Sequence, residues 1–159
     1  MPQPTNILFF LLFILLGTAT LNAQDLPKVF LIGENEEGYE KMLGKYPELL
    51  LNVSDNSMDK AYNHWIDLLS TIEDYANEIG YDIKGVKIWL NVFWDKNGAI
   101  DYLVYYPKPN SRNIDFDAFT GFLDTFLGTY QLDIKTKKNF SHYGSASFPV
   151  FGKRSADKG

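Results

Sequence analysis

The chain has 159 residues, of which 45% are hydrophobic and 16% aromatic, so it is large enough to bury a hydrophobic core without a disulfide or a structural metal. It contains no cysteine, which excludes thiol catalysis, disulfide exchange and cysteine-ligated zinc. The formal net charge is −5, a poor match for the phosphate backbone of a nucleic acid, and we therefore expect no nucleic-acid partner.

The N-terminus has the composition of a signal peptide. Residues 7–16 are all apolar, a run that is long enough for a signal peptide and shorter than the roughly 20 residues that span a bilayer. Small and polar residues follow, and cleavage after Ala23 or Ala19 would suit them. The residues before the run include no lysine or arginine, so an uncleaved membrane anchor is the alternative. We predict a signal peptide over residues 1–23 and a periplasmic or secreted protein.

After the signal peptide we predict one domain, residues 25–151, and a flexible tail, residues 152–159. The first elements of the domain are weakly marked. Short apolar runs at residues 28–33 and 49–53 are typical of strands, and the acidic segment between them indicates a polar turn or a brief helix.

The next element is strongly marked as a helix. Apolar residues recur at three- and four-residue spacing from Met58 to Ile79, while polar residues occupy the opposite side. Ser54, Asp55 and Ser57 are suitable N-caps, and Gly80 stands where a left-handed residue commonly ends a helix. One face of this helix must be buried.

Two alternating segments then predict a β-hairpin. Val86–Trp94 and Ala99–Tyr106 each alternate apolar residues with others, and Asn97-Gly98 marks the turn between them. Two turn geometries are possible, a two-residue turn and a three-residue loop with Gly98 in the left-handed conformation of a bulge.

The choice between the two turns sets the register of the hairpin. A two-residue turn would place Val92 opposite Leu103 and mix apolar with polar side chains. A three-residue loop would place Trp94 beside Ile100 and Val92 beside Tyr102, which gives one wholly apolar face. We therefore expect the second register.

A second amphipathic helix and a last strand complete the domain. Apolar residues form a stripe from Phe116 to Leu127, and Gly128 ends the helix. The final strand, about Phe140–Phe151, contains Pro149 and is expected to be irregular or at an edge. Together the elements predict a two-layer α+β fold, with two amphipathic helices packed on one face of an antiparallel sheet.

The order helix, hairpin, helix, strand makes residues 58–151 resemble the C-terminal domain of the energy transducer TonB. The resemblance lies in Gly85-Val86 at the start of a strand, in the turn Asp95–Gly98, and in the closing segment Phe148–Phe151. It implies a TonB-like fold and the binding of a partner by strand addition. Energy transducers also have a long proline-rich segment, which this chain lacks, so the resemblance does not imply coupling to the proton-motive force.

The candidate chemistry is sparse. His142 follows Ser141 in the last predicted strand, and neighbouring strand residues point to opposite faces, so the two cannot form a nucleophile and base pair. His64 falls on the polar side of the first long helix, and the acidic stretch 34–37 is expected to be a solvated loop rather than a cation site. We predict no catalytic residue, no metal and no cofactor, and thus no enzyme.

The second face of the hairpin is unusually aromatic. Trp89, Phe93, Leu103 and Tyr105 are expected to share it, which is more aromatic surface than a sheet open to water normally carries. Three interpretations compete: the face is covered as part of the core, it binds a protein partner or a second copy, or it is a platform for a sugar or another small ligand. We take these four residues as candidate partner-binding residues.

The predicted function is an exported, noncatalytic domain that binds a protein partner, or itself, through a sheet edge or this aromatic face. A small-ligand or glycan-binding module is the alternative, and a small secreted hydrolase built on scattered carboxylates is a further one. Contact with a membrane is expected only through the N-terminal segment, if that segment stays uncleaved.

Overall fold

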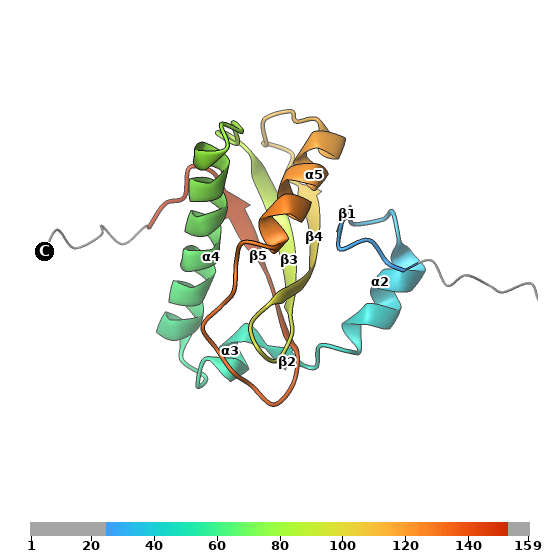
Figure 1. Cartoon of the computed structure of the whole chain (residues 1–159), viewed down its shortest axis with the longest axis vertical. Helices are drawn as coiled ribbons and strands as arrows, with labels where there is room; N and C mark the ends of the chain where they lie inside the picture. Colours follow the sequence, from blue (N-terminus) through green and yellow to red (C-terminus); the bar gives the residue numbers. More distant parts are fainter. Residues whose placement is uncertain (1–24, 153–159) are drawn as a thin grey trace, which may run out of the picture.

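The structure, a computed structural model, describes residues 25–152 (Figure 1). The predicted signal peptide, residues 1–23, lies outside the described residues, as does all but the first residue of the predicted tail, residues 152–159. In chain order the elements are β1 (Val29–Leu31), α2 (Glu36–Leu43), β2 (Glu48–Leu49), α3 (Leu50–Val53), α4 (Met58–Glu78), β3 (Lys87–Trp94), β4 (Ile100–Pro107), α5 (Phe116–Leu127) and β5 (Phe140–Ser147).

The strands form one five-stranded sheet in the order β1-β4-β3-β5-β2. β3 runs antiparallel to β4 and β5, whereas β1 is parallel to β4 and β2 is parallel to β5. The predicted α+β class is confirmed. The prediction of an antiparallel sheet is wrong, because the two short N-terminal strands join the sheet edges in parallel orientation.

Both long helices lie on the same face of the sheet (Figure 1). α4 begins after Ser57, whose hydroxyl accepts a hydrogen bond from the backbone N–H of Lys60. α5 begins after Asp115, whose carboxylate accepts one from the backbone N–H of Ala118. Their apolar stripes are buried against the centre of the sheet in one large core, which includes Leu68, Ile72, Leu90, Phe119 and Phe126. This burial supplies most of the stability of helices of this kind.

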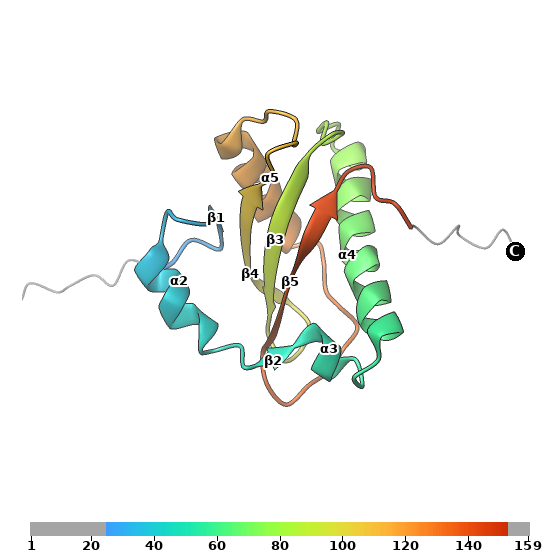
Figure 2. The same cartoon turned by 180° about the vertical axis from the view of Figure 1, so that it is seen from behind.

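A smaller core lies on the opposite face, beneath α2. Phe30 from β1, Met42 from α2 and Tyr46 pack there against Phe93 of β3 and Val104 of β4. In Figure 2, α2 lies beside β4, at the β1 edge of the sheet. The arrangement therefore differs from the predicted two layers, since helices pack on both faces near this edge.

The hairpin turn has the predicted local geometry. Gly98 adopts φ +88°, and Trp94 lies opposite Ile100 as the three-residue loop requires. One step further the register shifts, and Val92 lies opposite Leu103. The predicted pairing of Val92 with Tyr102 is wrong.

The shift is a β-bulge at Asp101. Phe93 pairs with Tyr102 while Trp94 pairs with Ile100, so β4 carries one extra residue between them. A carboxylate oxygen of Asp101 accepts a hydrogen bond of 2.8 Å from the Tyr46 hydroxyl, which holds the bulge in place from the α2 side. Because side chains alternate along a strand, one extra residue moves every following side chain of β4 to the face opposite the predicted one.

Candidate functional site

The four predicted partner-binding residues do not lie together. Leu103 and Tyr105 point into the large core under the helices, and Phe93 is buried on the other face in the small core under α2. Each of these three has an exposed fraction of 0%, whereas Trp89 is 38% exposed. The bulge separates Leu103 and Tyr105 from the other two residues, so Trp89 is the member of the set that remains at the surface.

Trp89 belongs to a different group of side chains, which we name the aromatic–lysine patch: Trp89, Tyr106, Lys108, Tyr143 and Ser145. The rings of Trp89 and Tyr143 are stacked, with centroids 5.6 Å apart, and the Lys108 Nζ lies 4.0 Å from the centroid of the Trp89 ring. The same Nζ donates a hydrogen bond to the Ser145 Oγ. Tyr106 and Tyr143 are 51% and 54% exposed, so the patch presents aromatic surface to solvent.

The sheet register explains how the patch is assembled. Trp89 of β3 lies opposite Tyr106 of β4 on one side and opposite Ser145 of β5 on the other. Figure 2 shows this face of the sheet, where α2 lies beside β4 and does not extend over β3 and β5. The patch therefore occupies the part of this sheet face that α2 leaves uncovered.

Beside the patch lies the open edge of β5, which we define as residues 142–147. β2 pairs with β5 at Phe140 and Ser141, and in residues 25–152 no strand pairs with the outer side of the remainder. Phe148 directs its N–H to the Val86 carbonyl and its carbonyl to the Gly85 N–H, toward β3. Backbone groups alternate in direction along a strand, so residues 143, 145 and 147 point away from β3.

A groove follows this edge on the helix side of the sheet. Its walls are formed by α4 and by β5 with the segment after it; the lining includes Tyr62, Trp65, Ile66, Leu69, Val150 and Phe151. The Trp65 Nε1 donates a hydrogen bond of 3.2 Å to the Ser145 carbonyl, which is one of the outward-pointing groups. Gly144 makes this approach possible, because a Cβ at this position would lie 2.8 Å from the Trp65 ring. The groove is thus apolar, with Tyr62 and Phe151 exposed at its rim.

The two histidines occupy different environments. His142 lies on β5 with its ring centroid 4.7 Å from that of Trp65, and burial lowers the pKa of its imidazole. Ser141 and His142 are consecutive residues of an unbroken strand, opposite Phe93 and Val92 respectively, so their side chains point to opposite faces. His64 is half-buried on α4. Ser141 and His142 therefore cannot act together as a nucleophile and base pair, as the sequence predicts.

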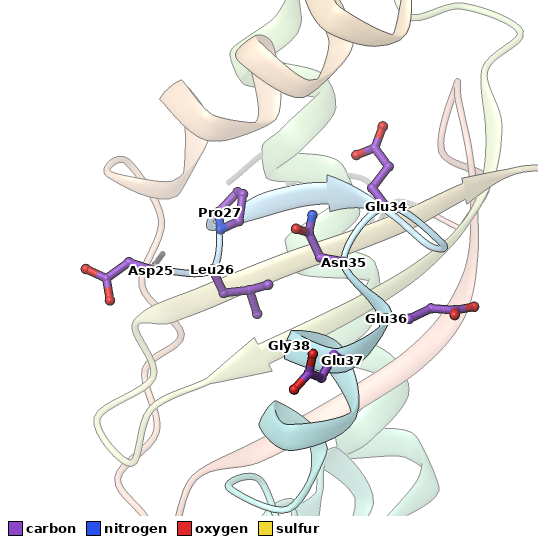
Figure 3. A pocket seen from close by; sticks show the side chains of 8 residues that line it. All are labelled: Asp25, Leu26, Pro27, Glu34, Asn35, Glu36, Glu37 and Gly38. Atoms are coloured by element: carbon purple, nitrogen blue, oxygen red, sulfur yellow. The ribbon is translucent and has the colours of Figure 1, made fainter. Parts of the chain in front are cut away.

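The predicted acidic loop is partly helical, because Glu36 and Glu37 form the first turn of α2. This turn, the residues before it and residues 25–27 line a shallow pocket (Figure 3). The carboxylates of Asp25, Glu34, Glu36 and Glu37 point in different directions in this view rather than toward a shared centre. Glu34 accepts a hydrogen bond from the backbone N–H of Leu31, and Glu37 pairs with Lys41. Across residues 25–152, no group of three or more histidine or acidic side chains is placed to hold a metal ion.

Among the described helices, none is both long and apolar enough to cross a membrane. The N-terminal segment, for which membrane contact is expected only if it stays uncleaved, lies outside this range.

Of the five members of the aromatic–lysine patch, sequence reasoning named Trp89 alone as a partner-binding residue and missed Tyr106, Lys108, Tyr143 and Ser145. Tyr106 was assigned to the opposite face because the bulge in β4 was not foreseen. Ser141, Tyr143 and Ser145 alternate along β5, and this period-2 pattern could have placed Tyr143 on one face of a strand. Lys108 follows the end of β4 and reaches across β3 to β5, a contact that no local pattern encodes.

Comparison of the chain with protein-family models, with curated proteins and with solved structures finds no match.

Proposed function

We propose that this chain is an exported, noncatalytic domain that binds a protein partner, which adds an extended segment to the open edge of β5. The observation that carries the proposal is the edge itself. Residues 142–147 turn a row of backbone donors and acceptors outward, and this stretch contains no proline and no lysine, arginine or acidic residue.

Natural sheets protect their edges with short strands, charged side chains, proline or covering segments. The opposite edge follows this rule, because β1 has three residues and is followed by a turn. β2 covers only the first two residues of β5. The remainder of β5 has no proline or charged residue, and no described strand pairs with its outer side. α4 and residues 150–151 line a groove beside it, and the Trp65 indole bonds one of its outward carbonyls. The other outward backbone groups support a role as a docking edge for another chain.

The surroundings of the edge support the same function. Exposed aromatic side chains among a few polar ones are favoured at the centres of protein interfaces, and the aromatic–lysine patch borders the edge on one face of the sheet. The element order α4-β3-β4-α5-β5 is the one that the resemblance to the TonB C-terminal domain implies, and that resemblance also implies strand addition. The predicted signal peptide supports export to the periplasm or beyond.

A glycan-binding module is the second candidate, and the exposed stack of Trp89 on Tyr143 favours it. Paired aromatic rings present a flat apolar surface on which a sugar ring can lie, and Ser145 and Lys108 offer polar contacts beside them. The two candidates differ in one respect. Strand addition requires the backbone of β5, whereas a sugar platform requires only the aromatic side chains.

The backbone of β5 can be tested with a single substitution. The Ser145 N–H points away from β3, so Ser145→Pro removes an outward donor and leaves the hydrogen bonds to β3 in place. The matched control is Ser145→Ala, which loses the same hydroxyl and keeps the N–H. Mature wild-type protein and both variants, checked for folding by circular dichroism, would be used to capture partners from the envelope fraction of the source organism.

We expect one protein to be captured by the wild type and by Ser145→Ala and to be lost with Ser145→Pro. Capture that survives Ser145→Pro and fails with Trp89→Ala would contradict strand addition and favour the aromatic platform.

A further inference from the structure

We infer that the partner segment is an extended peptide in which acidic residues alternate with apolar ones; this inference rests on the proposed strand addition to β5. A strand that pairs with residues 142–147 turns its side chains alternately to the two faces of the sheet. The two faces differ in chemistry at this edge. Each face therefore favours a different kind of side chain at every second position of the added strand.

The patch face selects for negative charge. Side chains of the added strand that lie opposite Tyr143, Ser145 and Ser147 share their face, and the Lys108 Nζ is already bonded to the Ser145 Oγ. Lys87 lies opposite Ser147 in the register and alternates onto the same face as Trp89. The side chains of this face at the edge are lysine, aromatic, serine and asparagine, with no carboxylate among residues 87, 89, 91, 143, 145 and 147. Carboxylates of the partner would therefore meet two lysines on this face of β3 and β5.

The groove face selects for apolar side chains. Side chains of the added strand that lie opposite Gly144 and Ala146 turn toward α4, where the groove is lined by Tyr62, Ile66 and Leu69. The Trp65 ring packs on Gly144 and Ala146 is fully buried, so the added side chains would lie beside the Trp65 ring in the groove. Apolar side chains of the partner would bury the exposed faces of Tyr62 and Phe151.

A second copy of the chain fits this edge poorly. If two β5 strands paired antiparallel about Ser145, the two Lys108 side chains would be brought onto the same face around the symmetry axis. Like charges placed close together across an interface are unfavourable. The charge of the patch thus favours an acidic partner over self-association.

The probe is a fluorescein-labelled nine-residue peptide that alternates valine with glutamate. Matched peptides carry glutamine or lysine in place of glutamate. Because the sequence repeats every two residues, a shift of the peptide by two residues along β5 leaves the same side chains on each face. Binding to the mature protein would be measured by fluorescence anisotropy at two salt concentrations. Indole N–H signals in NMR spectra report the contact site, because Trp65 and Trp89 border the edge while Trp94 is buried at 1% exposure.

We expect the glutamate peptide to bind about three- to tenfold more tightly than the glutamine peptide and at least about tenfold more tightly than the lysine peptide at low salt. The signals of Trp65 and Trp89 should shift and that of Trp94 should not. Lys108→Gln should reduce the preference for the glutamate peptide over the glutamine peptide, and Lys87→Gln together with Lys108→Gln should abolish it, while Lys108→Arg should keep it. Lys137→Gln, in the loop between α5 and β5, is the control and should leave binding unchanged.

The outcomes separate this inference from the proposed function. Equal binding of the three peptides, abolished by Ser145→Pro, would overturn the acidic preference and leave strand addition intact. If no peptide binds while Ser145→Pro still abolishes partner capture, the inference fails and the proposed function stands. If the glutamate peptide binds Ser145→Pro as tightly as it binds the wild type, the segment is not a strand on β5, and both the inference and the proposed function fail.

Discussion

The bulge at Asp101 can be tested by comparing two aromatic residues that the unbulged register would place on one face, Trp89 and Tyr105. The Tyr105 side chain is fully buried, its ring centroid lies 5.2 Å from that of Phe119, and its hydroxyl lies 2.8 Å from the Thr120 Oγ1. Burial raises the pKa of the Tyr105 hydroxyl to about 12, so it is a neutral hydrogen-bonding group at ordinary pH.

Tyr105→Ala should therefore be costly. Truncation of a fully buried large aromatic side chain costs about 3–5 kcal/mol of unfolding free energy, out of about 5–15 kcal/mol for a typical domain. Trp89→Ala removes a partly exposed ring, one stacking contact worth about 0.5–1.5 kcal/mol and one cation–π contact worth about 0.5–1 kcal/mol. We expect Tyr105→Ala to cost at least about 2 kcal/mol more than Trp89→Ala. Tyr105→Phe should cost about 1 kcal/mol, since it removes only the hydroxyl.

The assay is urea unfolding followed by far-UV circular dichroism, because the loss of a tryptophan alters the fluorescence signal itself. Equal slopes of free energy against urea concentration would show that the variants unfold from comparable states. If Trp89→Ala costs as much as Tyr105→Ala or more, both side chains lie in similar surroundings and the bulged register is refuted.

Three further predictions concern single positions. Gly98→Ala should destabilise the fold by more than about 2 kcal/mol, because Gly98 has φ +88° and a Cβ would lie 2.0 Å from a backbone carbonyl oxygen. The control is Gly121→Ala, at an open position within α5, which should stabilise the fold by about 0.5–1 kcal/mol. Thermal unfolding of the two variants would compare these effects. Gly144→Ala should cost about 1–3 kcal/mol and shift the NMR indole signal of Trp65, which a Cβ would displace; an unchanged signal would contradict the close approach. Burial lowers the pKa of His142 in the folded protein, so the unfolded chain binds a proton first as the pH falls below about 6.5. The stability that the neutral imidazole contributes is then complete above that pH and declines below it. In urea unfolding, His142→Asn should lose less stability than the wild type between pH 7.5 and 5.5. An identical pH dependence of the two proteins would show that His142 does not titrate as proposed.

The long amphipathic elements were predictable because their information is local. The stripes of α4 and α5 repeat over several turns, and their caps at Ser57 and Asp115 lie next to them in sequence. The glycine at position 98 likewise identified the loop type of the hairpin. These features depend on neighbouring residues, which a sequence displays directly.

The mixed sheet was not predictable on the same basis. Val29 of β1 pairs with Leu103 of β4, more than seventy positions away, and the apolar run around β1 is compatible with either orientation. The bulge was missed for a related reason. Alternation assigns faces only while the register is continuous, and both residue sets of β4 are apolar enough to fill a core, so the pattern itself does not reveal the extra residue at Asp101.

The candidate site depends on where α2 packs and where the bulge lies. With the bulge in place, Leu103 and Tyr105 complete the large core, and the alternate residues of β4 turn to the face that α2 shares. On that face α2 covers Val104 and leaves Tyr106 exposed beside Trp89, and Lys108 crosses to β5. A helix longer or placed further along the sheet would bury the patch. The short α2 therefore leaves uncovered the part of the sheet that borders the open edge of β5. This is why the proposed function treats the exposed aromatic–lysine patch and the edge together as one surface for a partner.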